Sequence, residues 1–95
     1  MTQRISNRDL EAVVGRINRV TGQPQTQYKR VKSKLKAQIG NYHLDWAYGG
    51  VKLVQMVNEG GGIRVISNGG YGTKRELYNE MQTFCRAIEI AQEEK

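Results

Sequence analysis

Three glycine clusters divide the middle of this chain into short segments. They are Tyr48-Gly49-Gly50, Gly60-Gly61-Gly62 and the stretch 69–73. Glycine adopts left-handed backbone conformations that other residues avoid, so each cluster predicts a turn or a close backbone approach. The apolar runs between the clusters, residues 51–57 and 63–66, are too short for stable helices and predict strands. This spacing favours an antiparallel sheet in which tight turns join successive strands.

Amphipathic helices are predicted on both sides of this glycine-rich region. Ser6 followed by Asp9 is typical of a helix start, and Thr21-Gly22 is typical of a helix end, which predicts a helix over residues 7–20. A second capping pattern, Thr73 followed by Glu76, opens a helix predicted over residues 74–92. Its apolar stripe comprises Leu77, Met81, Phe84, Cys85 and Ile88.

Residues 37–47 alternate in polarity and predict one more strand. Tyr42, Leu44 and Trp46 share one face, which we expect to be the core face. Residues 25–36 are compatible with either a strand with one cationic face or an irregular basic arm. The sequence therefore predicts one α+β domain over residues 1–95, in the order α-β-β-β-α. Its antiparallel sheet has three or four strands and is covered on one face by two helices.

Length and composition predict the oligomeric state and the cellular location. A chain of 95 residues with 38% hydrophobic residues buries a modest core, and its strands are apolar on both faces, so we expect a homo-oligomer. The single cysteine cannot form an internal disulfide, which favours a reducing, cytoplasmic location. The N-terminal residues lead into a polar amphipathic segment, which is not typical of a signal peptide. Apolar runs stay well short of the roughly 20 residues of a membrane span, so no membrane partner is expected.

The net charge of +6 is concentrated near one segment. Residues 1–39 hold nine of the 15 Lys and Arg residues and two of the nine acids. The densest part contains Lys29, Arg30, Lys32, Lys34 and Lys36 without an acid among them. Such a run attracts polyanions and is compatible with non-specific nucleic-acid binding, which we keep as the alternative function. The interpretation that we favour is a solvated edge strand whose lysines discourage pairing with other chains.

A candidate anion site lies where the last glycine cluster meets the second helix. It comprises Gly70, Tyr71, Gly72, Thr73, Lys74 and Arg75. Free amides at a helix start and two adjacent cations favour a phosphate or carboxylate. The loop has neither the Gly-Lys-Ser/Thr ending of a phosphate-binding loop nor a dinucleotide fingerprint. The alternative is that its glycines serve only the geometry of the connection.

Other chemistry-bearing residues are sparse. His43 and Asp45 lie two residues apart, and we interpret them as a surface pair, since no nucleophile is suitably placed to complete a catalytic set. One histidine, one cysteine and scattered carboxylates do not supply a metal site. We therefore expect neither an enzyme nor a bound cofactor. Tyr48 and Tyr71 lie in glycine turns and are candidates for exposed contacts.

Several segments resemble one family. They are Asn41-Tyr42-His43-Leu44, residues 47–51, Met56-Val57-Asn58, Gly61-Gly62-Ile63, residues 74–78, and the opening helix from Leu10 to Gly22. Together they are similar to small accessory proteins encoded by tailed bacteriophages. The resemblance implies a non-catalytic protein that binds and inhibits or sequesters a host component, for example as an anti-defence factor. Its target would be a host protein or a small phosphorylated signal, and the resemblance assigns no site residue.

Overall fold

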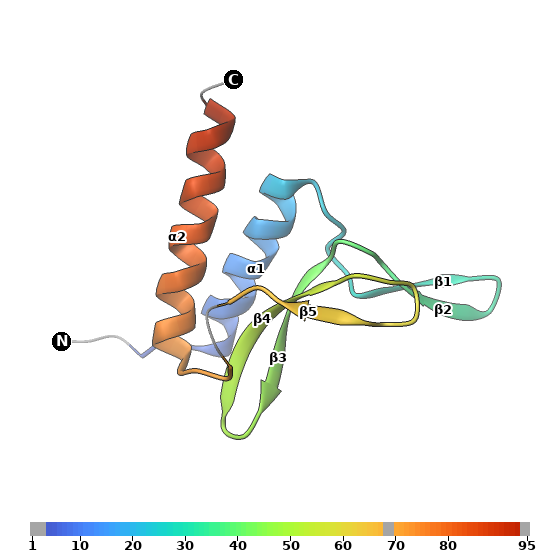
Figure 1. The fold of residues 1–95 in the computed structure, drawn as a ribbon, viewed down its shortest axis with the longest axis horizontal. Coiled ribbons are helices and arrows are strands. Elements are labelled where there is room, and N and C mark those ends of the chain that lie inside the picture. The colour runs from blue at the N-terminus through green and yellow to red at the C-terminus, as the bar shows by residue number, and fades with distance from the viewer. Residues whose placement is uncertain (1–3, 68–69, 94–95) are drawn as a thin grey trace.

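A computed structural model describes residues 4–67 and 70–93 of the chain. Within them, helices lie at both ends and strands lie between (Figure 1). The elements are α1 (Asn7–Thr21), β1 (Tyr28–Val31), β2 (Lys34–Ala37), β3 (Tyr42–Ala47), β4 (Gly50–Met56), β5 (Ile63–Val65) and α2 (Lys74–Glu93). This arrangement confirms the predicted α+β fold.

The main sheet is antiparallel and has the strand order β3-β4-β5. Leu44 lies opposite Leu53 in the register of β3 and β4, and Val54 lies opposite Val65 in the register of β4 and β5. Helix α1 packs against β3 and helix α2 against β4, while the two helices also contact each other. The predicted three-stranded sheet with two helices on one face is therefore confirmed. β1 and β2 form a separate two-stranded sheet and do not extend it.

Local capping explains where α1 begins and ends. The Ser6 hydroxyl accepts a hydrogen bond from the Asp9 amide at 3.1 Å, and the Ser6 amide donates to the Asp9 carboxylate at 2.9 Å. These bonds satisfy donors that the first turn leaves unpaired, and they lower the pKa of Asp9. Gly22 ends the helix at a φ of 74°. Both capping predictions from the sequence are confirmed.

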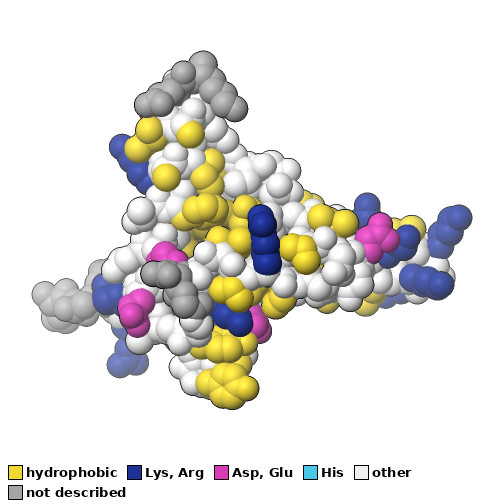
Figure 2. Space-filling view, viewed as in Figure 1, with side chains coloured by type: hydrophobic (Ala, Val, Ile, Leu, Met, Phe, Trp, Pro, Cys, Tyr) yellow, Lys and Arg dark blue, Asp and Glu magenta, His cyan; other side chains and the backbone are white. Residues whose placement is uncertain are grey.

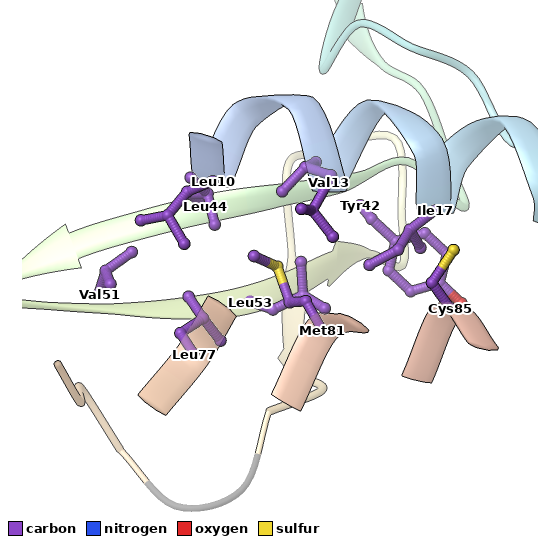
Figure 3. Close-up of a cluster of buried hydrophobic side chains, with 11 residues drawn as sticks. Leu10, Val13, Ile17, Tyr42, Leu44, Val51, Leu53, Leu77, Met81 and Cys85 are labelled. Atoms are coloured by element: carbon purple, nitrogen blue, oxygen red, sulfur yellow. The ribbon is translucent and has the colours of Figure 1, made fainter. Parts of the chain in front are cut away.

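The core lies between the two helices and one face of the sheet (Figure 3). Its members are Leu10, Val13, Val14 and Ile17 of α1, Tyr42, Leu44, Val51 and Leu53 of the sheet, and Leu77, Met81 and Cys85 of α2. Phe84 is only partly buried and meets the Tyr42 ring edge-on, with ring centroids 6.0 Å apart. β4 is buried on both faces, as predicted for a central strand, because Val54 and Met56 are buried on the side away from the helices.

The strand predicted over residues 37–47 is shorter in the structure. Only residues 42–47 pair as β3, and the chain turns before them at Gly40, whose φ is 95°. The Gly40 amide donates to the Met56 carbonyl, while the Asn41 side chain donates to the Pro24 carbonyl. These contacts bend residues 38–41 away from a continuous strand. The predicted hairpin turn at Tyr48-Gly49 is confirmed, with φ values of 53° and 73°.

Candidate functional site

The basic segment forms a β-hairpin, which we call the arm (residues 28–37). Tyr28 pairs with Ala37, and Val31 pairs with Lys34. The chain reverses at Lys32 and Ser33, whose φ values of 49° and 69° are those of a type I′ turn. The prediction of one strand with a single cationic face is therefore wrong, and an irregular arm is wrong as well. Figure 1 shows the arm projecting from the molecule away from both helices.

The pairing register distributes the five cations of the arm around it. Lys29 lies directly opposite Lys36, and Lys34 follows on the same face, two positions from Lys36. Arg30 lies on the other face, and Lys32 occupies the turn. All five side chains are exposed, and dark blue side chains gather at this projection in Figure 2. The arm thus presents positive charge on both faces and at its end.

Few contacts balance this charge. Lys36 lies 3.8 Å from Glu59, and both side chains are exposed, so the pair is weak and screened by salt. The Gln38 amide donates to the Gln27 carbonyl at 2.8 Å and closes the base of the arm. The Ala37 amide donates to the Glu59 carbonyl at 3.3 Å. Backbone hydrogen bonds therefore hold the base of the arm, while its lysine and arginine side chains are exposed to solvent.

Two backbone amides of the predicted anion-binding loop donate hydrogen bonds within the protein. The Gly72 amide donates to the Val51 carbonyl at 3.0 Å, and the Val51 amide donates back to Gly72 at the same distance. The Thr73 amide donates to the Glu76 carboxylate at 3.2 Å, while the Glu76 amide donates to the Thr73 hydroxyl at 3.1 Å. These bonds lower the pKa of Glu76. The predicted capping box is confirmed, and Gly69 of the loop lies outside the described residues.

These hydrogen bonds make the start of α2 less favourable for binding an anion. At the start of α2, the Gly72 and Thr73 amides already donate hydrogen bonds to groups of the protein. The Glu76 carboxylate at the same place would repel an anion. The two predicted cations, Lys74 and Arg75, are exposed in the first turn of α2. The hydrogen bonds favour the alternative in which the glycines only serve the connection between β5 and α2, and anion binding there stays a prediction.

The loop also brings aromatic and charged side chains together beside the β3–β4 turn. The Tyr71 hydroxyl donates to the Asp45 carboxylate at 2.7 Å, and this bond raises the pKa of Tyr71. The Lys52 ammonium lies 4.3 Å from the centroid of the Tyr71 ring and 3.9 Å from Asp45. The Tyr48 ring meets the Tyr71 ring edge-on at 5.6 Å. The predicted exposure of Tyr48 is confirmed, since 96% of its surface is accessible.

Two sequence interpretations change near this cluster. Trp46 was expected in the core, yet 43% of its surface is exposed, with the Lys74 ammonium 5.9 Å from its ring centroid. Trp46 lies near the end of β3, which is an edge strand of the main sheet. Asp45 bonds to Tyr71, whereas the His43 ring lies 3.1 Å from the Asn41 amide oxygen. Partial burial lowers the pKa of His43, while the negative charge of Asp45 acts in the opposite direction.

No group of three or more His, Cys, Asp or Glu residues within residues 4–67 and 70–93 could hold a metal ion. Neither described helix is long and apolar enough to cross a membrane. Comparison of the chain with protein-family models, curated proteins and solved structures found no significant match.

The cap of α2 gives a first testable expectation. Thr73→Ala removes the hydroxyl that accepts from the Glu76 amide, and we expect the free energy of unfolding to fall by about 1 kcal/mol. Urea denaturation monitored by circular dichroism measures this change. Thr73→Ser retains the hydroxyl and should unfold close to wild type. Equal midpoints for the alanine and serine variants would show that the cap does not stabilise the helix.

Proposed function

We propose that this protein is a non-catalytic nucleic-acid-binding protein that uses the arm. The observation that carries the proposal is a projecting two-stranded ribbon with five exposed cations and no acidic residue between positions 28 and 37. Lysine and arginine bind phosphate oxygens and release the counterions condensed on the backbone. A surface of this kind supplies affinity for a polyanion independently of its base sequence.

The shape of the arm supports the same proposal. A two-stranded ribbon is narrow enough to enter the major groove of a DNA duplex, which is about 12 Å wide. Lys29, Lys34 and Lys36 on one face and Arg30 on the other would then contact phosphates on both sides of the ribbon. Lysines also discourage strand pairing at the exposed edges of a hairpin, and this role is compatible with phosphate binding.

The hypothesis based on the resemblance to phage proteins stays a second proposal. In that hypothesis the chain binds a host protein or a small phosphorylated signal, and the loop at residues 70–75 receives the signal. The Gly72 and Thr73 amides are already hydrogen bonded within the protein, so the arm is favoured over this loop as the site that binds anions. Self-association and a cytoplasmic location likewise remain predictions.

Charge removal on one face of the arm tests the proposal. We expect the triple variant Lys29→Ser/Lys34→Ser/Lys36→Ser to bind a labelled DNA duplex roughly a hundredfold more weakly at 0.1 M salt, because about three phosphate contacts are lost. Fluorescence anisotropy measures the affinity. The matched control Arg4→Ser/Arg8→Ser/Arg86→Ser removes the same charge from exposed positions outside the arm. Equal losses in the two variants would mean that net charge, and not the arm, drives binding.

A further inference from the structure

Tyr48 occupies a position that the fold itself does not explain. It is the first central residue of the β3–β4 turn, at a φ of 53°, and 96% of its surface is exposed. A left-handed conformation is unfavourable for a bulky residue, and asparagine is preferred there when glycine follows in a type I′ turn. The exposed ring gains no stabilisation from burial. Neither turn formation nor core packing therefore accounts for a tyrosine at this place.

Two more aromatic residues lie at the same end of the hairpin, one on each face of the sheet. Tyr71 meets it edge-on, and Trp46 lies two residues before it on β3. Asp45 and Lys52 are opposite each other in the strand register and both contact Tyr71, which places this ring on their face of the sheet. Trp46 lies on the opposite face. In Figure 2, hydrophobic side chains accordingly gather at the projecting end of the β3–β4 hairpin.

The ring of Tyr71 is held in place before any ligand binds. Its hydroxyl is fixed by the Asp45 carboxylate, and the Lys52 ammonium lies over its face. A ring that is already oriented loses little conformational entropy when a flat partner stacks on it. Lys52 lies 4.3 Å from the Tyr71 ring centroid but also 3.9 Å from the Asp45 carboxylate, which offsets part of its charge. Lys74 is exposed and lies 5.9 Å from the Trp46 ring centroid. Exposed rings beside cations are the combination that single-stranded nucleic-acid sites use for bases and phosphates.

We propose that this hairpin tip, comprising Trp46, Tyr48 and Tyr71 with Lys52 and Lys74, is a stacking site for unpaired bases of single-stranded nucleic acid. The inference rests on the proposed function and assigns a ligand class to a second surface beyond the arm. A protein partner is the less favourable occupant. Standard protein interfaces bury about 800 Å² on each partner and place their aromatic anchors in desolvated centres. The three rings at this tip offer at most roughly 150–250 Å² each, which falls short of that area.

Trp46 makes the test direct, because it is the only tryptophan in the chain. We expect oligothymidylate to change the fluorescence of Trp46 at the concentrations at which it raises the anisotropy of a labelled strand. Tyr48→Asn removes the ring and creates the Asn-Gly sequence that the turn prefers, so its Tm should equal or exceed that of wild type. We expect this variant to bind oligothymidylate about 10- to 100-fold more weakly. Tyr48→Phe retains the ring and should bind like wild type.

The same titrations separate the two proposals. Oligothymidylate binding with unaltered Trp46 fluorescence and an unaltered affinity of Tyr48→Asn would overturn the stacking site while leaving the arm in place. Absence of binding to both oligothymidylate and duplex by the wild-type protein would overturn the proposed function and the stacking site together. An equal loss of duplex and single-strand affinity in Tyr48→Asn would contradict a site for unpaired bases, since duplex bases are already stacked.

Discussion

Asn18→Ala is expected to lower the free energy of unfolding by about 2–4 kcal/mol. Only 1% of Asn18 is exposed, and its side chain takes the place of a neighbouring strand at the outer edge of β3. Its amide nitrogen donates to the Tyr42 carbonyl at 3.0 Å, and its amide oxygen accepts from the Tyr42 amide at 2.8 Å. Alanine would leave both backbone groups buried without partners, and each such group costs about 1–3 kcal/mol.

Thermal unfolding measures this loss. A decrease of this size corresponds to a fall in Tm of roughly 10–25 °C for a domain of this length. Asn7→Ala changes an exposed residue in the first turn of the same helix and serves as the matched control. An Asn18→Ala variant that melts together with the control would show that the contact between α1 and β3 is not formed as described.

Excision of the arm is expected to abolish nucleic-acid binding while leaving the rest of the protein folded. The Gln27 carbonyl and Gln38 amide are hydrogen bonded at 2.8 Å, so residues 28–37 can be replaced by an Asn-Gly turn without displacing either end. The core cluster contains no residue of the arm, and the one buried residue of the arm is Ala37 at its base. We therefore expect a far smaller change in Tm than for Asn18→Ala. Affinity for DNA should fall at least ~1000-fold at low salt, because five cations are removed.

Two measurements on the excised variant are needed. Circular dichroism and thermal unfolding report the fold, and anisotropy reports binding. A full-length variant with Lys29, Arg30, Lys32, Lys34 and Lys36 all changed to glutamine keeps the arm and removes its charge. It should lose binding to the same extent. Wild-type affinity in the excised protein would place the nucleic-acid site elsewhere.

The helices and the main sheet were predictable because their signals are local. The capping residues Ser6 and Thr73 mark the two helix starts in the sequence itself, and Tyr48-Gly49 marks a hairpin turn. The arm was not predictable in the same way. Its turn uses Lys32-Ser33 at positive φ, where glycine, asparagine or aspartate is the usual signal. Without that signal, the alternating cations resembled a single strand.

The aromatic tip was only partly predictable for a different reason. Glycine turns indicated exposure of Tyr48 and Tyr71, which the structure confirms for Tyr48 and shows as partial for Tyr71. Alternation assigned Trp46 to the face of Leu44, but it cannot show that β3 is an edge strand of the sheet. The bond between Tyr71 and Asp45 depends on the pairing of Gly72 with Val51, which are far apart in the sequence. Contacts of this kind follow from tertiary structure alone.

The salt dependence of duplex binding tests the central role of the arm most directly. The observed association constant is measured across a salt series for the wild-type protein and for Lys29→Ser/Lys34→Ser/Lys36→Ser. Each lost phosphate contact lowers the magnitude of the logarithmic salt slope by about 0.9 on B-DNA, so we expect a slope shallower by about 2–3 in the variant. Identical slopes for the two proteins would contradict nucleic-acid binding through the arm.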